Sequence, residues 1–171
     1  MTFQRHTSPK GFVLVEVLVY IGIIALILTA VGTLAALTNN ARAKQTVERE
    51  VEEQGRQVLE QVLQTARNSS GITSPTSRAS GSSLTVTVDS APASPTVFSL
   101  SGTTIQITEG AAAAVSLTNS NVLASALSIQ NLTRASTPGT IRVSFTLSGT
   151  ITSGKLPFIY SKTFYGAASL R

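Results

Sequence analysis

The sequence predicts an α+β fold in which one long N-terminal helix leads into an antiparallel β-sheet domain. The stretch from Phe12 to Leu37 is apolar and carries one charged side chain. Residues 38–67 keep apolar side chains at helical spacing, and after Gly71 the composition changes to Ser, Thr, Gly and β-branched residues that alternate with a period of two. A helical segment followed by a run of strands is typical of α+β domains.

The apolar run at residues 12–37 predicts a transmembrane helix. About 20 apolar residues in a helix cross the core of a bilayer, so this run is long enough to span one with some tilt. The many Val and Ile residues do not favour a strand, because a lone strand in hydrocarbon leaves its backbone groups unpaired. A secretory signal peptide has a shorter apolar region than this run. An ordinary membrane anchor fits the length but gives no reason for a charged residue inside the run.

Glu16 is that charged residue. A carboxylate inside a membrane helix costs about 2.5–3.5 kcal/mol on insertion scales, and such residues are functional by default. If the chain is cut after Gly11, the amine of Phe12 lies four residues before Glu16. Positions i and i+4 share a helix face, and a carboxylate near a helix N-terminus also meets a favourable dipole.

The segment KGFVLVE at residues 10–16, followed by the apolar run, resembles the class III signal of type IV prepilins and pseudopilins. The resemblance covers residues 8 to about 37. It implies that a prepilin peptidase recognises a leader containing Lys10 and cuts between Gly11 and Phe12. It also implies N-methylation of Phe12, and a salt bridge between Glu16 and the terminal amine of a neighbouring subunit during assembly.

The same resemblance divides the chain into a leader, a transmembrane and assembly helix, an amphipathic stem helix and a β-rich globular domain. The boundaries that we predict are 1–11, 12–37, 38–69 and 70–171. The new subunit is expected in the inner (cytoplasmic) membrane, as a single-pass protein whose C-terminal domain lies outside the cytoplasm. Its expected partners are the membrane, the prepilin peptidase and other subunits of the filament.

Small side chains recur at intervals of three and four residues inside the predicted span. They form one stripe along the helix, made by Gly22, Ala25, Thr29, Gly32 and Ala36. Small residues let helix backbones approach closely in lipid, so the stripe predicts packing against the helices of other subunits. The alternative interpretation is that Gly and Ala are simply common in membrane helices.

Residues 38–67 predict an amphipathic continuation of the helix. Its apolar positions, with charged residues between them, are Val47, Val51, Val58, Leu59, Val62, Leu63 and Ala66. Glu52 and Arg56 make an i,i+4 pair of opposite charge, worth a few tenths of a kcal/mol. Gly71 is interpreted as the stop signal of the helix. We expect the apolar stripe to dock on the β-sheet.

The remaining sequence predicts a loop at 71–83 and then half-buried antiparallel strands. The predicted strands are 83–89, 96–102, 103–108, 114–119, 122–133, 140–149 and 156–166. Ser101-Gly102 and Ser148-Gly149 are interpreted as turns between consecutive strands. The sequon that begins at Asn131 is interpreted as polar loop, and Ser161-Lys162 as a surface pair.

The side-chain chemistry indicates that the protein is not an enzyme. The chain has no Cys, and its one histidine, His6, lies in the predicted leader. Thiol chemistry and the usual imidazole base are therefore excluded from the mature chain, and zinc is disfavoured. Calcium takes six to eight oxygen ligands, whereas the β-region offers only Asp89 and Glu109 as carboxylates. We expect no catalytic site, no metal, no cofactor and no small-molecule substrate.

The resemblance implies a minor pilin or a minor, J-like pseudopilin of a type IV pilus or type II secretion-like filament. The chain lacks the Cys pair, the stem proline and the calcium loop that major subunits of these systems carry, and its last aromatic strand is similar to that of the J-type subunits. Two alternatives stay open. One is a DNA-uptake or adhesive pilin, although the net charge of +5 is scattered and marks no nucleic-acid footprint. The other is a membrane-anchored extracytoplasmic domain that does not polymerise.

Overall fold

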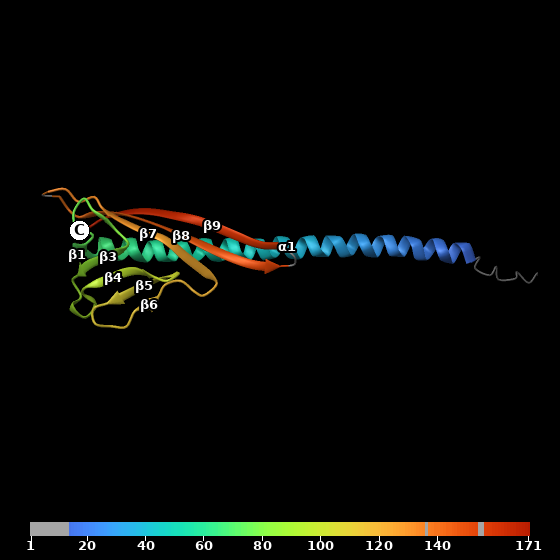
Figure 1. Ribbon diagram of the computed structural model, residues 1–171, viewed down its shortest axis with the longest axis horizontal. Coiled ribbons are helices and arrows are strands. Elements are labelled where there is room, and N and C mark those ends of the chain that lie inside the picture. The colour runs from blue at the N-terminus through green and yellow to red at the C-terminus, as the bar shows by residue number, and fades with distance from the viewer. Residues whose placement is uncertain (1–13, 136, 154–155) are drawn as a thin grey trace, which may run out of the picture. The chain divides into compact units, whose positions relative to one another are not determined.

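The computed structural model describes residues 14–135, 137–153 and 156–171. It begins with one long helix, α1 (Leu14–Arg67), and continues almost entirely in strands (Figure 1). The further elements are β1 (Ser69–Ser74), β2 (Ser80–Gly81), β3 (Ser83–Val88), the 3-10 helix η1 (Ala91–Ala93), β4 (Thr96–Ser101), β5 (Thr104–Glu109), β6 (Val115–Ser116), β7 (Val122–Asn131), β8 (Thr140–Ser153) and β9 (Leu156–Ser169). This arrangement confirms the predicted α+β fold.

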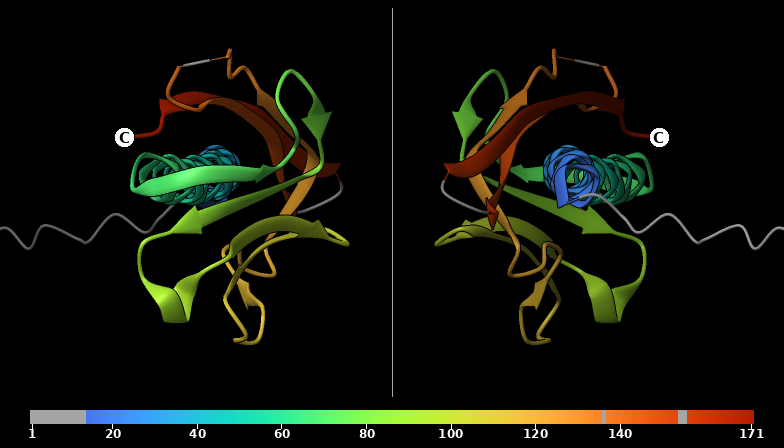
Figure 2. Two further views of the ribbon diagram at one scale, coloured as in Figure 1. Left: turned by 90° about the vertical axis from the view of Figure 1, so that its left-hand side faces the viewer. Right: turned by 90° about the vertical axis from the view of Figure 1, so that its right-hand side faces the viewer.

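The chain divides into two compact units, Met1–Arg42 and Ala43–Arg171. In the first unit, the described residues belong to the N-terminal part of α1. The second unit contains the rest of α1 and two antiparallel sheets, whose strand orders are β1-β3-β4-β5-β6 and β2-β7-β8-β9. Figure 2 shows the two sheets curving around the helical segment of the second unit. The predicted β-sheet domain thus consists of two sheets.

The core of the second unit lies between α1 and the two sheets. The buried positions of α1 are spaced three or four residues apart and form one face of the helix: Val47, Val51, Gly55, Val58, Val62 and Ala66. They confirm the predicted apolar stripe. From β8, Ile141, Val143, Phe145 and Leu147 are fully buried, as their alternation with polar residues predicts. Burying one such side chain contributes about 1.5–3 kcal/mol, so this core accounts for the docking of α1 on the sheets.

Gly55 lets α1 approach β9 closely. A Cβ atom added at Gly55 would overlap the ring of Phe164. That ring stacks on Phe145 with 5.5 Å between centroids and 21° between planes. Gly149 and Gly166 serve the same contact from the sheet side, because a Cβ there would lie 2.7 Å from Val47 Cγ1 and 2.8 Å from a Leu59 methyl, respectively. The glycines therefore set how near the helix lies to the four-stranded sheet.

Several predicted boundaries were wrong. Ser148-Gly149 is not a turn, because Gly149 lies within β8 and pairs with both Val122 and Tyr160. Gly71 does not stop the helix, which ends at Arg67; it lies in β1 opposite Thr87. The predicted loop at 71–83 contains most of β1 and all of β2. In each case the glycine or serine lies in a strand, where it allows tight packing or pairs with a neighbouring strand. The local sequence does not distinguish this role from a turn or a loop.

Two other turn and loop interpretations had opposite outcomes. The turn at Ser101-Gly102 is confirmed, since it joins β4 to β5 and Gly102 has a φ of 60°. Asn131 is not an ordinary loop residue, because it ends β7 and is only 3% exposed. Its side-chain amide donates to the carbonyl of Pro75 at 2.8 Å, and its Oδ1 accepts from the Thr133 N–H at 3.0 Å.

We predict that Gly55→Ala destabilises the protein, although alanine favours a helix interior over glycine by about 1 kcal/mol. Forcing a methyl group against Phe164 is overpacking, which costs about 1–3 kcal/mol. Thermal melts of the full chain in a non-ionic detergent, followed by circular dichroism, measure the change. Gly71→Ala is the matched control, because a Cβ at Gly71 meets nothing within 4 Å. A melting temperature for Gly55→Ala equal to or above that of the wild type would contradict this packing.

Candidate functional site

The predicted processing site, formed by Lys10, Gly11 and Phe12, lies outside the described residues, so cleavage and methylation remain predictions. Glu16 is described, and it lies in the first turn of α1 as that helix is bounded here. The small-residue stripe is described in full. The structure therefore gives the setting of the predicted assembly residues, and leaves their role to be tested.

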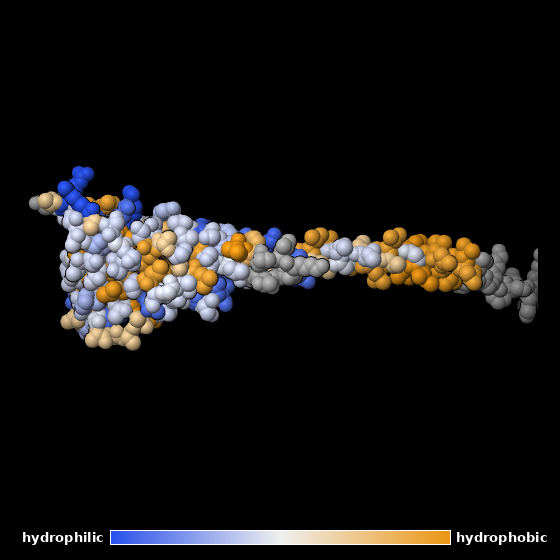
Figure 3. Space-filling view, viewed as in Figure 1, coloured by the Kyte–Doolittle hydropathy of each residue, from blue (hydrophilic) through white to orange (hydrophobic). Residues whose placement is uncertain are grey.

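The side chains of α1 from Leu14 to Leu37 are all exposed in the chain. Most of them are large and apolar, with exposures such as 79% for Leu14 and 71% for Leu26, and Figure 3 shows this apolar surface. Among the described residues, α1 is one helix that is long and apolar enough to cross a membrane. Continuous apolar surface of this extent marks contact with a membrane or with other proteins.

The threonine hydroxyl groups in this part of α1 are satisfied by the helix itself. The hydroxyl groups of Thr29, Thr33 and Thr38 donate hydrogen bonds of 2.8–2.9 Å to backbone carbonyls three or four residues earlier. In hydrocarbon each polar group needs an internal partner, because no water is present to replace it. The threonine hydroxyl groups therefore add no unpaired donor to the surface of the predicted span.

Glu16 and the small-residue stripe face different directions. With about 100° between successive residues of an α-helix, the stripe from Gly22 to Ala36 occupies an arc of about 80°, and Glu16 lies about 160° from its centre. Glu16 is flanked on its own side by Val15, Val19, Tyr20 and Ile23. A Cβ added at Gly22 or Gly32 would meet nothing within 4 Å among the described residues. Both faces are therefore open to partners outside the chain.

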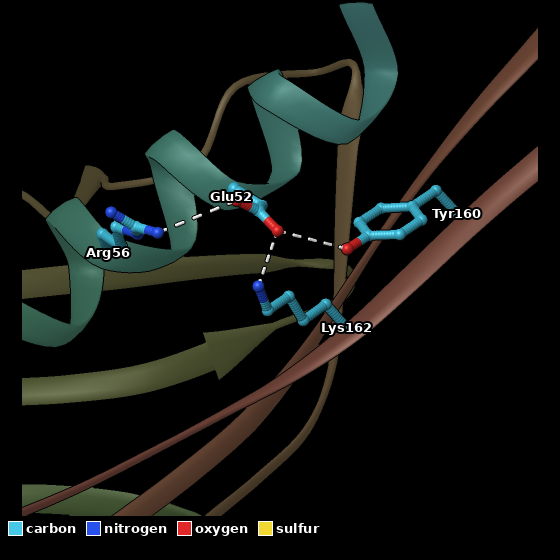
Figure 4. A network of polar contacts seen from close by, with 4 residues as sticks. All are labelled: Glu52, Arg56, Tyr160 and Lys162. Atoms are coloured by element: carbon cyan, nitrogen blue, oxygen red, sulfur yellow. Dashed lines mark hydrogen bonds and ion pairs between the residues drawn. The ribbon is translucent and has the colours of Figure 1, made fainter. Parts of the chain in front are cut away.

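A second polar cluster, in the second unit, connects α1 to β9 (Figure 4). Lys162 Nζ donates to Glu52 Oε1 at 2.6 Å, and the Tyr160 hydroxyl lies 3.4 Å from the same oxygen. Arg56 lies 3.8 Å from Glu52 Oε2, which confirms the predicted i,i+4 pair. The Glu52 and Lys162 side chains are 37% and 38% exposed. Lys162 and Tyr160 both come from β9, so the cluster connects this strand to α1 through one carboxylate.

The pKa of Glu52 is lowered from its ordinary value. The main cause is the hydrogen bond from Lys162, followed by the positive charge of Lys162, with smaller contributions from Tyr160 and Arg56. Spacing alone did not predict this cluster, because Glu52 and Lys162 are 110 residues apart. The prediction that Ser161 and Lys162 form a surface pair was partly wrong, since Ser161 is exposed whereas Lys162 is partly buried and contacts Glu52 on α1. Within the described part of the chain, no group of three His, Cys, Asp or Glu residues could hold a metal ion.

We predict that the Glu52 cluster makes stability depend on pH in the acid range. A carboxyl group whose pKa is lowered by folding stabilises the protein above its unfolded pKa, about 4.3 for Glu. That stabilisation is lost as the pH falls through the lowered folded pKa. Glu52→Gln should therefore melt below the wild type at pH 7, and the difference should vanish in melts at progressively lower pH. Glu60→Gln, an exposed position on the same helix, is the control. A difference between wild type and Glu52→Gln that persists unchanged to pH 2 would refute the assignment.

No family model, curated protein or solved structure matches this chain.

Proposed function

We propose that this chain is a minor pilin or pseudopilin, the subunit of a type IV pilus or type II secretion-like filament. In this proposal a prepilin peptidase removes residues 1–11, Phe12 becomes the methylated N-terminus, and the subunit joins the filament through its N-terminal helix. The observation that supports it best is the difference in burial between the two parts of α1. Residues 47–66 bury one face in the domain, whereas residues 14–37 bury none and carry a single carboxylate.

The exposed part of α1 requires an apolar environment. Lipid supplies it for the single subunit, and the helices of neighbouring subunits supply it in a filament. Apolar surface alone gives little drive for association in lipid, where close packing and polar contacts decide which helices pair. The stripe of small residues provides the close packing, and Glu16 provides the polar contact. Because these two features lie on different sides of the helix, one helix can contact at least two neighbours.

The proposal gives Glu16 a partner. An unpaired carboxylate in hydrocarbon is costly. After cleavage the amine of Phe12 is a nearby cation, so Glu16 can be neutralised without a basic side chain. While the subunit is in the membrane, the leader side lies in the cytoplasm and the second unit lies outside it. A membrane anchor that does not polymerise would explain the apolar surface equally well, but it would leave Glu16 without a function.

We predict that Glu16→Ala leaves membrane insertion intact and impairs assembly. The substitution removes a charge that is costly in hydrocarbon, so membrane insertion should be unharmed or easier. In the filament, the amine of a neighbouring Phe12 would lose its partner, and losing one partner of a buried pair costs about 3–5 kcal/mol. Glu16→Asp should restore assembly only in part, because its side chain is shorter.

The measurement compares the amount of cleaved, membrane-inserted subunit with the amount recovered in sheared or cross-linked filaments. Glu60→Ala is a matched control, since it removes a carboxylate from the same helix within the second unit. Equal incorporation of Glu16→Ala and wild type would show that assembly depends on other contacts and not on Glu16. Loss of insertion in Glu16→Ala would also contradict the proposal, which gives Glu16 no role in that step.

A further inference from the structure

Strand β9 lies along the part of α1 that belongs to the second unit, and it runs in the opposite direction to the helix (Figure 1). A residue nearer the start of β9 contacts a residue nearer the start of α1. The contacts are Gly166 with Leu63, Phe164 with Gly55, Lys162 with Glu52 and Phe158 with Lys44. The first residues of β9 therefore point towards the residues with which α1 enters the second unit.

The spacing of the last two contacts shows that strand and helix are aligned. From Glu52 to Lys44 the helix covers about 12 Å at 1.5 Å per residue. From Lys162 to Phe158 the strand covers about 13 Å at 3.3 Å per residue. Because the two lengths agree, distances along β9 can be compared directly with distances along α1 in this region.

A cation and two apolar side chains lie together near the start of β9. Lys44 Nζ lies 5.0 Å from the centroid of the Phe158 ring, within the range of a cation–π contact. The Lys44 side chain is exposed and Phe158 is partly buried. Ile159 follows on the opposite face of the strand and is 64% exposed. We call these three residues the foot of the second unit.

The foot lies a short distance along the chain from the apolar run. Only residues 38–43 separate Lys44 from Leu37, and they correspond to about 10 Å of helix. The headgroup layer on each side of a bilayer adds about 5–8 Å to the hydrocarbon core. β9 begins at Leu156, about 7 Å beyond Phe158 in the direction of the apolar run. A lysine side chain can also extend its ammonium group towards the headgroups along its apolar stem.

We propose that the foot contacts the phospholipid headgroup layer when α1 crosses the membrane. The ammonium group of Lys44 pairs with headgroup phosphates, and Phe158 and Ile159 enter the layer beside it. A lipid surface fits the foot because segments that bind the membrane interface combine cations with exposed apolar side chains. It also fits because the foot follows the apolar run on the same helix. The inference rests on the membrane insertion in the proposed function and adds a lipid contact made by the second unit.

The test measures the depth of single tryptophan side chains, since the chain contains no tryptophan of its own. Variants of the full chain are reconstituted into vesicles of phosphatidylcholine and phosphatidylglycerol. The vesicles carry a nitroxide quencher either on the lipid headgroup or within the acyl chain. Phe158→Trp should lose fluorescence to the headgroup quencher. Ile159→Trp should behave in the same way, and it replaces an exposed side chain that the core does not need.

Tyr165→Trp is the matched control for position. Tyr165 is 70% exposed on the same strand, and it lies about 23 Å from Phe158 along β9, away from the apolar run. This variant should keep its fluorescence with both quenchers. Quenching of Tyr165→Trp as strong as that of Phe158→Trp would overturn the inference, because the lipid contact would not be confined to the foot.

Leu26→Trp reports the insertion of α1 separately, and the acyl-chain quencher should reduce its fluorescence. If Leu26→Trp is quenched but neither Phe158→Trp nor Ile159→Trp is, the inference is overturned and membrane insertion stands. If Leu26→Trp is not quenched, the membrane insertion in the proposed function fails, and the inference fails with it.

The role of Lys44 is tested in the Phe158→Trp chain. Lys44→Gln should reduce the headgroup quenching, because it removes the cation that pairs with phosphate. Arg49→Gln is the matched control for charge, since Arg49 is an exposed basic residue on the same helix, and it should leave the quenching unchanged. Equal effects of the two substitutions would overturn the assignment of Lys44 as the cation that contacts the headgroups.

Discussion

The close contact between α1 and β9 is the constraint on which the rest of the second unit depends. Gly55 admits the ring of Phe164 to the helix surface, and Phe164 in turn stacks on Phe145 of β8. The Glu52 cluster adds two polar contacts between the same strand and the helix. Because β9 is the edge strand of its sheet, no further strand holds it from the other side. The packing of α1 therefore determines where the first residues of β9, with Phe158, are presented.

The two parts of α1 have surfaces suited to different surroundings. In the second unit its valines repeat every three or four residues and leave the opposite side polar, as a helix on a sheet requires. Between Leu14 and Leu37 apolar residues occur on all sides, and the hydroxyl groups of the threonines bond to the helix backbone. Such a surface is suited to lipid or to other helices. A carboxylate in such surroundings is costly, and a cation supplied from outside this part of the chain would offset that cost.

Much of this account could be predicted from the sequence, because helices and strands leave local patterns. The apolar run, the stripe from Val47 to Ala66 and the alternation in β8 all gave elements that the structure confirms. Partners between distant segments could not be predicted in this way. Nothing in the sequence near Gly55 indicates that Phe164 will lie against it. A glycine at position 149 gives the same local pattern whether it forms a turn or allows α1 to pack closely on the strand. Lys44 and Phe158 likewise become neighbours only through the packing of β9 along α1. For the candidate site the opposite holds: Glu16 and the small-residue stripe are recognised directly in the sequence, whereas the partners that we propose for them belong to other molecules.

We propose that the mature chain begins at Phe12 and functions as a filament subunit. The mass and N-terminal sequence of the chain extracted from membranes test this claim most directly. We predict a chain that starts at Phe12 and carries one added methyl group, and an uncleaved chain when Gly11 is replaced by a bulky residue. An intact leader in the wild type, a chain that begins at a residue other than Phe12, or normal processing of the Gly11 variant would contradict it.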